Sequence, residues 1–284
     1  MKILVLGANG QLGSDIVAAF KKEHEVIAKT HDDIDVGNLS DIYQLLIGIQ
    51  PKILVNTTAY HQVELCEQNP DIAELINATS VGFMAKICHT LHIKFVHFST
   101  DYVFDGEKKS PYNEDDIPVP LNVYGKTKLE GEKLIILNNP DAIIIRISAI
   151  YGHHPCRAKK GLNFIQLMLK LAYEKGEVKV VDDEFVSPSN TKNIVQQLAL
   201  ILNTDIKGTI HATSEGQCSW YEFAEEIFKY TNTPVKLFKA SSSDFQYKVN
   251  RPKYSVLQNE VLNKNHINIM LPWKEALHQY LNEI

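Results

Sequence analysis

The sequence has few cysteines, and no pattern links them. Its four cysteines, at positions 66, 88, 156 and 218, are widely spaced and form no Cys-x-x-Cys pair. Zinc ribbons and small disulfide-stabilised domains need closely grouped cysteines, so we expect reduced thiols and neither of these classes. His153, His154 and Cys156 are the one grouping that suggests a metal ion. No second ligand pair of suitable spacing follows, so we predict no metal site.

Long apolar runs and clusters of one charge are also missing. No apolar stretch reaches the roughly 18 residues that a membrane span needs. The short apolar start runs directly into Gly7, which is unlike a signal peptide. The net charge is −5, and the densest basic spot, Arg157 with Lys159 and Lys160, is short. We therefore expect a cytoplasmic protein that neither crosses a membrane nor binds nucleic acid.

The first half of the chain alternates between short apolar runs and helical periodicity. Apolar runs lie at 3–6, 25–28, 53–55, 95–98 and 142–147, and helical segments lie at 12–20, 39–49, 73–91 and 121–137. Strands that are apolar throughout and alternate with helices predict a parallel sheet covered on both faces. The predicted fold class is therefore α/β, with a Rossmann-type doubly wound parallel sheet.

The second half suggests a smaller lobe. We expect residues 1–150 to form a dinucleotide-binding domain, with elements near 176–203 returning to it. Residues 151–175 and 204–284 would mainly form a C-terminal α/β substrate-binding lobe. Its best-marked helix covers 219–230, where Ser219 and Glu222 have the spacing of a capping box. A crevice between the two parts would hold the substrate.

A glycine motif follows the first predicted strand and opens the first helix. Gly7, Gly10 and Gly13 are spaced as G-x-x-G-x-x-G. In that context the glycines permit a tight turn, close approach of a pyrophosphate, and close packing of helix on strand. The helix N-terminus then favours the anion. A plain turn in a flavodoxin-like fold is the alternative.

The end of the second strand bears on the choice of cofactor. NAD-binding proteins usually carry an acidic residue there, to hold the ribose hydroxyls. This chain has Lys29 and His31, which could face a 2′-phosphate. NADP is therefore favoured, and NAD is the alternative if Asp32 or Asp33 takes the acidic position. Lys29 could equally be a solvated surface lysine.

Tyr124 and Lys128 form the strongest candidate for catalysis. They lie four residues apart in a predicted helix, on one face. Tyrosine has an ordinary pKa near 10, and a nearby ammonium group favours its phenolate form. Ser99 and Thr100 follow the fourth strand, where a hydroxyl could bind a substrate carbonyl at the carboxyl edge of the sheet. A Ser-Thr-Asp turn with a purely local role is the alternative there.

Several segments together resemble one family along nearly the whole chain. They are Gly7–Gly13, Asn77–Val81, Ser99–Asp105, Pro120–Glu132, Asn163-Phe164, Ser219–Phe223 and Arg251–Leu257. The glycine motif and Tyr-x-x-x-Lys are shared by the extended short-chain dehydrogenases/reductases. The Ser99–Asp105 and Pro120–Glu132 blocks and the late Arg-Pro-x-x-Ser resemble, more narrowly, the dTDP-4-dehydrorhamnose reductases.

The resemblance implies reduction by NAD(P)H of the C4 keto group of dTDP-4-dehydro-L-rhamnose, giving dTDP-L-rhamnose. The implied catalytic residues are Thr100, Tyr124 and Lys128. The cofactor would contact Gly7, Asn9, Gly10, Gln11, Leu12, Gly13, Lys29, Asp35, Val36, Asn56, Thr57, Ala59, Tyr60, Ser99, Tyr124 and Lys128. The nucleotide sugar would contact Thr100, Asp101, Tyr102, Val103, Tyr124, Asn163, Phe164, Trp220 and Arg251.

Three alternatives stay open. His61, Glu64 and Glu184 depart from the residues usual in the family, and they lie in segments that would flank the sugar. The substrate could therefore be another keto-deoxy nucleotide sugar, for a reductase or an epimerase. The chain could also be a non-catalytic subunit, because the regulatory subunit of methionine adenosyltransferase resembles the same family. The family implies no fixed oligomeric state, and a homodimer is one possibility.

Overall fold

The structure is a computed structural model that describes residues 1–155, 161–245 and 249–284. Its central sheet has the strand order β2, β1, β3, β4, β5, β10, and every neighbouring pair is parallel. The strands are β1 (Lys2–Leu6), β2 (Glu25–Lys29), β3 (Ile53–Asn56), β4 (Lys94–Thr100), β5 (Ile143–Ile147) and β10 (Gly208–His211). The chain order reverses between β1 and β3, and doubly wound folds bind ligands at the strand ends beside such a point. The predicted fold class is confirmed.

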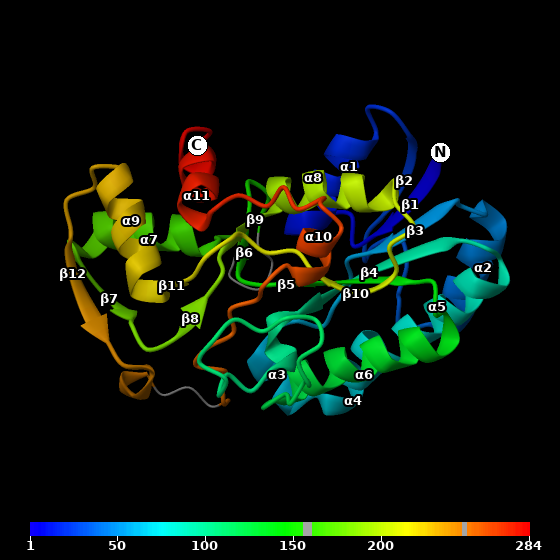
Figure 1. Ribbon diagram of the computed structural model, residues 1–284, viewed down its shortest axis with the longest axis horizontal. Coiled ribbons are helices and arrows are strands. Elements are labelled where there is room, and N and C mark those ends of the chain that lie inside the picture. Colours follow the sequence, from blue (N-terminus) through cyan, green and yellow to red (C-terminus); the bar gives the residue numbers. More distant parts are fainter. Residues whose placement is uncertain (156–160, 246–248) are drawn as a thin grey trace.

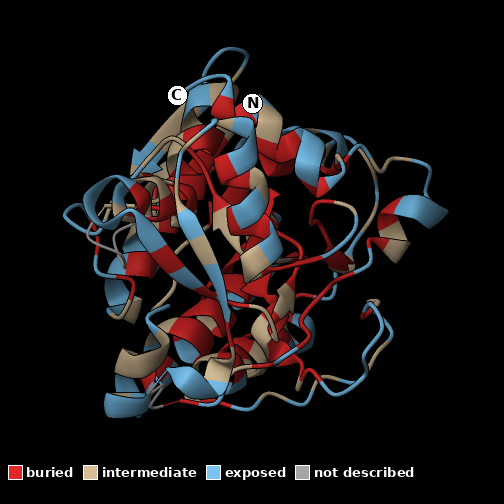
Figure 2. Ribbon diagram, turned by 90° about the vertical axis from the view of Figure 1, so that its left-hand side faces the viewer, coloured by how far each residue is buried: buried red, intermediate tan, exposed pale blue. Residues whose placement is uncertain are grey.

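Side chains of the sheet alternate between two apolar layers. Ile3 and Val5 face α1 (Gln11–Phe20) and α8 (Thr191–Leu202). Leu4 and Leu6 face α2 (Leu39–Ile49) and α5 (Ser80–Thr90), beside α6 (Val123–Asn138). Figure 1 shows α1 and α8 on one side of the sheet and α5 and α6 on the other, and Figure 2 shows the buried residues gathered in the interior. Because both faces are covered, most side chains of these strands are apolar.

The helical stretch that was predicted at 73–91 contains a distortion. It begins with α4 (Pro70–Glu74), continues through a π-helical turn, η1 (Leu75–Thr79), and ends as α5. Helix α3 (Val63–Gln68) precedes it and was not predicted. A Cβ on Gly131 of α6 would lie 2.2 Å from the carbonyl oxygen of Asn77, so the two helices are in close contact at this turn. Such single π turns are frequent at functional sites.

The smaller lobe has its own apolar core. Strands β7 (Glu177–Val181) and β12 (Lys236–Ala240) pair in parallel. They pack with α7 (Phe164–Lys175), α9 (Trp220–Tyr230) and α11 (Trp273–Leu281). The predicted capping box is confirmed, since Ser219 and Glu222 each accept a hydrogen bond from the other's backbone N–H. The short pairs β6 (Ile150–Tyr151) with β9 (Ser189–Asn190), and β8 (Phe185–Val186) with β11 (Cys218–Ser219), complete the described strands.

Two strands lie elsewhere than expected. β7 falls in the range expected to return to the large sheet, yet it pairs with β12 of the lobe. β10 falls in the range assigned to the lobe, yet it extends the large sheet beside β5, and α10 (Glu260–Lys264) packs on it. β10 reads Gly-Thr-Ile-His, in which Ile210 is the one strongly apolar residue, so no hydrophobic run marks it. α8 packs against α1 in the large domain.

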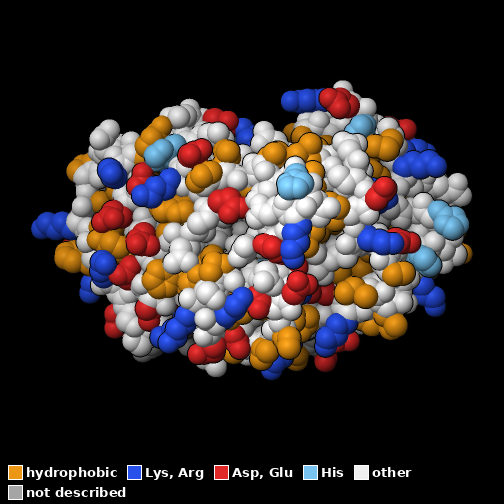
Figure 3. Space-filling model, in the orientation of Figure 1, with side chains coloured by type: hydrophobic (Ala, Val, Ile, Leu, Met, Phe, Trp, Pro, Cys, Tyr) orange, Lys and Arg blue, Asp and Glu red, His pale blue; other side chains and the backbone are white. Residues whose placement is uncertain are grey.

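The surface shows no large field of one charge on the face in view. Figure 3 shows Lys and Arg side chains interspersed with Asp and Glu across it. Within the described residues, no helix is both long enough and apolar enough to cross a membrane. The basic stretch 157–160 and Cys156, which the sequence analysis singled out, lie outside the described residues.

A buried ion pair fastens α6 to the sheet. Arg146 on β5 donates from Nε and Nη2 to the two carboxylate oxygens of Glu132, at 2.9 and 2.6 Å. Both side chains are at most 5% exposed. Such a bidentate pair compensates the desolvation of both charges, and removing one partner leaves the other charge buried alone.

We therefore predict that Glu132→Gln lowers the free energy of unfolding by about 3–5 kcal/mol, because the Arg146 guanidinium loses its counter-charge. Urea denaturation measures this. Glu130→Gln on the same helix is the matched control, because its ion pair with Lys133 is solvent-exposed; it should cost less than about 0.5 kcal/mol. Equal effects of the two changes would contradict the account.

Candidate active site

The glycine turn between β1 and α1 is built by close backbone contacts. Gly7 has φ +78°, and a Cβ there would lie 2.6 Å from Thr57 Oγ1. A Cβ on Gly13 would lie 2.2 Å from the carbonyl oxygen of Gly7, so only glycine lets α1 pack this closely on the turn. Gly10 is the N-cap of α1, and no side chain among the described residues caps this helix end. The first-turn amides are thus arranged to bind an anion.

The other residues of the turn divide between core and cleft. Leu12 is buried in the sheet core, so its side chain faces away from the turn. Asn9 is partly exposed. Gln11 is 8% exposed, and its Nε2 has no hydrogen-bond partner among the described residues. A buried donor without a partner is costly, which is consistent with a ligand completing its contacts.

Lys29 ends β2 beside this turn. Its carbonyl oxygen accepts the N–H groups of both Gly7 and Ala8, at 3.0 Å each. Asp33 is occupied locally, because it accepts the N–H and the hydroxyl of Thr30, at 2.8 Å each. Asp35 similarly accepts the N–H of Gly37, and the Val36 side chain is buried in the core. The end of β2 therefore presents a lysine, and Asp33 is engaged within its own turn.

The loop after β3 is held from both sides. Thr57 Oγ1 donates to the carbonyl oxygen of Leu6, at 2.8 Å. Asn77 in the π turn accepts the N–H of Tyr60 at 2.8 Å and donates to Tyr60's carbonyl oxygen at 3.0 Å and to Thr127 Oγ1 at 3.1 Å. Residues 56–60, including Ala59, are thereby fixed between the glycine turn and α6. The resemblance gave Asn77 no role, and its place in a distorted helix becomes visible only in the structure.

Tyr124 lies at the start of α6, against the end of β4. Asn122 caps this helix by accepting the N–H of Gly125, at 2.9 Å. A Cβ on Gly125 would lie 2.1 Å from the carbonyl oxygen of Tyr102, so this helix end is pressed onto the turn after β4. The rings of Tyr102 and Tyr124 meet edge to face at 5.8 Å. Burial raises the pKa of Tyr124 above its usual 10, and its hydrogen bond with Thr100 partly opposes that shift.

Lys128 lies one turn further along α6 and is almost completely buried. Its Nζ donates to the carbonyl oxygen of Phe98 at 2.7 Å and lies 2.7 Å from His97 Nε2. Burial lowers the pKa of Lys128 to about 7, although the Glu132 carboxylate acts in the opposite direction. Ser99 lies between Phe98 and Thr100 in β4, and its buried hydroxyl has no hydrogen-bond partner among the described residues. The structure therefore brings Thr100, Tyr124 and Lys128 together at one edge of the sheet.

Asp101 occupies a different position from that expected of a sugar ligand. It is 4% exposed, and its carboxylate accepts hydroxyls from Thr100, Ser148 and Ser255, at 3.1, 2.9 and 2.6 Å. Burial raises the pKa of Asp101, and the three hydroxyl donors oppose that shift. This side chain joins the end of β4 to the turn after β5 and to the C-terminal segment. The Asp101 carboxylate therefore orients Thr100 and does not face the cleft.

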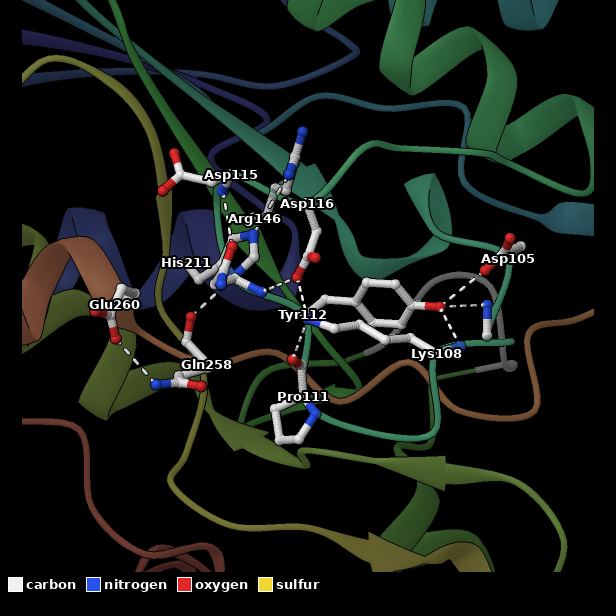
Figure 4. Close-up of polar contacts among 12 residues, drawn as sticks. Asp105, Lys108, Pro111, Tyr112, Asp115, Asp116, Arg146, His211, Gln258 and Glu260 are labelled. Atoms are coloured by element: carbon white, nitrogen blue, oxygen red, sulfur yellow. Dashed lines mark hydrogen bonds and ion pairs between the residues drawn. The ribbon is translucent and has the colours of Figure 1, made fainter.

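The segment after Asp101 is also tied to the C-terminal part of the chain. Tyr112 donates its N–H to Val256 at 2.9 Å and accepts that of Gln258 at 2.7 Å. Its ring stacks on Phe104 at 4.2 Å. Figure 4 shows this tyrosine beside Arg146 and its hydroxyl bonded to Asp105. Val103 is fully buried in the same cluster, so its side chain faces the core and not the cleft.

The remaining substrate candidates lie in the lobe. Asn163 caps α7 and donates to the Gly152 carbonyl oxygen and the Tyr280 hydroxyl, so its side chain supports the lobe from inside. Phe164 and Trp220 pack ring to ring at 4.7 Å, and both are partly exposed. Arg251 forms an ion pair with Glu64 of α3, at 2.5 Å. This pair joins the lobe's C-terminal segment to the large domain beside the site.

Three buried polar residues of the site were not predicted from the sequence. They are His97 in β4, Ser148 after β5, and Ser255 in the C-terminal segment. His97 left a signal, since it interrupts an otherwise apolar strand, and a buried polar side chain needs a partner. Across the described ranges, no three His, Cys, Asp or Glu side chains are grouped so that they could hold a metal ion.

Comparison with known proteins decides the family. The model of the RmlD substrate binding domain family matches residues 1–284. The chain belongs to this family. It is 37% identical to the spore coat polysaccharide biosynthesis protein SpsK of Bacillus subtilis, over 99% of this chain and 97% of that one. It is 34% identical to the dTDP-4-dehydrorhamnose reductase of Burkholderia thailandensis, over 98% and 97%.

Solved structures of the family have the same fold over the whole chain. The dTDP-4-dehydrorhamnose reductase of Bacillus anthracis, in complex with NADP, superposes with a TM-score of 0.94 at 32% identity, covering 100% of this chain and 99% of that one. The orthologue from Clostridium acetobutylicum gives a TM-score of 0.94 at 37% identity, with the same coverage. The UDP-glucose 4-epimerase of Thermus thermophilus shares the fold at 14% identity, with a TM-score of 0.83.

If the glycine turn binds the pyrophosphate, a methyl group at Gly13, where the backbone contact is closest, should disturb both the turn and the binding. We predict that Gly13→Ala weakens NADPH binding at least tenfold and lowers the free energy of unfolding by about 1–3 kcal/mol, because the added Cβ displaces α1 from Gly7. Isothermal calorimetry and thermal unfolding measure the two effects. Gly48→Ala in α2 is the control, since a Cβ there meets nothing within 4 Å. It should leave binding unchanged and raise stability slightly.

Proposed function

We propose that this protein is a reductase that uses NADPH to convert the C4 keto group of dTDP-4-dehydro-L-rhamnose to the hydroxyl of dTDP-L-rhamnose. The observation that carries the proposal is the meeting of Tyr124, Lys128 and Thr100 at the sheet edge beside the glycine turn. Relatives of about a third identity over the full length bear the name of that reductase, and one was solved with NADP. Membership of this family and the match in fold over the whole chain support the same chemistry.

The site fits a dinucleotide at several independent points. Among the described residues, no side chain caps the N-terminus of α1 and none bonds to Gln11 Nε2. These donors and the close glycine contacts suit a pyrophosphate. Lys29 at the end of β2 suits the 2′-phosphate that distinguishes NADP from NAD. When bound, the reduced nicotinamide supplies the hydride.

The residues of this chain would manage the proton and the developing negative charge. Because burial raises the pKa of Tyr124, its hydroxyl is fully protonated at neutral pH, as a general acid must be. Tyr124 would give that proton to the former keto oxygen. The Thr100 hydroxyl donates to Asp101 in this structure and would rotate to donate to the same oxygen in the substrate complex. The Lys128 ammonium would stabilise the tyrosinate that remains.

Sugar recognition would come from the rim of the site. Arg251 and Glu64 form an ion pair next to the tyrosines, and Trp220 with Phe164 offers an apolar face.

A cytoplasmic location is part of the proposal, supported by the free thiols of Cys66, Cys88 and Cys218, which suit a reducing compartment. A homodimer remains a prediction from the family resemblance.

The direct test is oxidation of NADPH and NADH by the pure protein, with dTDP-4-dehydrorhamnose generated by the upstream enzymes. We expect rapid oxidation and dTDP-rhamnose as the product. A tightly retained NAD without net oxidation would instead indicate an epimerase. Intact cofactor binding without turnover, together with capture of a methionine adenosyltransferase, would instead indicate the regulatory subunit.

We predict that Tyr124→Phe lowers kcat by about 10²–10⁴-fold while NADPH still binds, because the variant lacks only the proton donor. Steady-state kinetics and calorimetry separate the two effects. Tyr43→Phe, at an exposed position on α2, is the matched control and should be fully active. A Tyr124→Phe enzyme with nearly normal turnover would remove the tyrosine from the mechanism.

We also predict that Lys29→Ala raises the KM for NADPH by about tenfold and leaves that for NADH nearly unchanged, because only NADPH carries the 2′-phosphate. Lys22→Ala, exposed beyond the end of α1, is the control and should alter neither. If Lys29→Ala changed both KM values equally, the 2′-phosphate contact would be ruled out.

A further inference from the structure

A chain of buried polar groups runs beneath the candidate catalytic residues. It passes from Thr58 through Asn56 and His97 to Lys128, and ends on the carbonyl oxygen of Phe98. Asn56 and His97 are completely buried, and Lys128 is 1% exposed. Each buried donor must face an acceptor. One hydrogen bond of known direction therefore fixes the direction of the next one along the chain of groups.

Thr58 fixes the orientation of the Asn56 amide. The backbone N–H of Thr58 lies 3.1 Å from Asn56 Oδ1, and the Thr58 hydroxyl lies 2.6 Å from the same oxygen. A backbone N–H can only donate, so Oδ1 must face Thr58 and the amide NH₂ must face His97. If the amide were turned over, its NH₂ group would face the backbone N–H of Thr58, and two donors would meet.

The amide in turn fixes the tautomer of His97. Asn56 Nδ2 lies 3.1 Å from His97 Nδ1, so Nδ1 accepts a hydrogen bond and carries no proton. A neutral imidazole then carries its proton on Nε2. Burial lowers the pKa of His97, which keeps the ring neutral. His97 therefore presents an N–H donor to Lys128.

That donor meets the lysine nitrogen at 2.7 Å. An ammonium group has three donors and no acceptor, so it cannot accept from Nε2–H. A neutral amine can accept there with its lone pair and still donate to the Phe98 carbonyl oxygen. We propose that Thr58, Asn56 and His97 act as positioning residues that hold Lys128 as a neutral amine until the cofactor binds.

The charged groups around this site are consistent with the proposal. Glu132 on α6 is the acidic group that acts on Lys128, and its charge is largely neutralised by Arg146 of β5. Tyr124 on α6 is uncharged at neutral pH, and the Asp101 carboxylate at the end of β4 is bonded to three hydroxyls. The low pKa of Lys128 agrees with the hydrogen-bond directions.

Cofactor binding would then change the state of Lys128. This step rests on the proposed function, in which ribose hydroxyls supply acceptors that an ammonium group needs. The lysine would leave the His97 N–H and take up a proton. Above the titration midpoint of the ligand-free protein, the positive charge that the Tyr124 mechanism requires would thus arise on loading of the cofactor.

The test uses the ligand-free protein first, so it does not depend on activity. Long-range ¹H–¹⁵N spectra give the tautomer of His97, assigned by His97→Gln. Spectra of protein labelled with ¹³C at lysine Cε give the titration of Lys128, assigned by Lys128→Met. We expect the Nε2–H tautomer and a titration midpoint of about 7. The Nδ1–H tautomer, or a Lys128 that stays charged above about pH 9, would overturn the proposal.

Asn56→Asp is the informative variant, because it keeps the shape and reverses the hydrogen bonds. A carboxylate accepts from Thr58 and from His97 Nδ1–H together, so Nε2 would accept from a Lys128 ammonium. We expect the other tautomer and a Lys128 midpoint above about pH 9. An unchanged tautomer in a folded variant would contradict the proposal, and if the variant does not fold, the wild-type spectra decide alone.

Calorimetry then tests the cofactor step. NADH binding at pH 8, measured in buffers of different ionisation enthalpy, should take up roughly 0.9 proton in the wild type and almost none in Lys128→Met. NADH is used because it lacks the titrating 2′-phosphate. No uptake in the wild type would overturn the coupling to cofactor. Inactivity toward the sugar nucleotide, with the expected spectra, would contradict the proposed function and leave this inference standing.

Discussion

The carboxylate of Asp101 accepts hydrogen bonds from three hydroxyls that belong to three separate parts of the chain. Thr100 is its neighbour at the end of β4, Ser148 follows β5, and Ser255 lies in the C-terminal segment. Burying a carboxylate costs free energy unless hydrogen-bond donors surround it. The three segments are therefore held together by the hydrogen bonds that this one carboxylate needs. Thr100 is thereby oriented next to Tyr124, and the C-terminal segment is fastened to the edge of the large sheet.

A second polar layer lies beneath that edge, on the buried face of α6. This face carries a single large apolar side chain, and its buried residues are Gly125, Thr127, Lys128, Gly131, Glu132 and Ile135. The glycines bring the helix backbone into contact with Tyr102 and Asn77. The Glu132 carboxylate is paired with Arg146, and Lys128 is held by the His97 network. Helix α6 is thus held by polar contacts and close approach, and its function depends on the same contacts.

The sequence alone is enough to predict five strands of the large sheet and most helices, because strands covered on both faces are short, nearly continuous apolar runs. It cannot predict β10, whose four residues contain a single strongly apolar side chain, nor the parallel partner of β7, because pairing between distant strands leaves no local pattern. The π turn at Asn77 is likewise hidden inside an apparently regular helical stretch.

The candidate site follows the same rule. Tyr124, Lys128, Thr100 and the glycines have local spacings that can be recognised, and the structure brings them to one edge. Roles that depend on distant partners cannot be read in this way: Asp101 meets Ser255 across 154 positions, and Asn163 is committed to Tyr280. Val103 and Leu12 fall within motifs, yet their side chains belong to the core.

In the proposed reaction, a hydride from the cofactor and a proton from Tyr124 reach one carbonyl group at this edge of the sheet. The most direct measurement uses NADPH deuterated at both C4 positions of the nicotinamide, with the keto sugar nucleotide as acceptor. The account predicts a product one mass unit heavier, with deuterium at C4 of the sugar as seen by NMR. A product without deuterium at C4, or unchanged substrate after cofactor has bound, would contradict it.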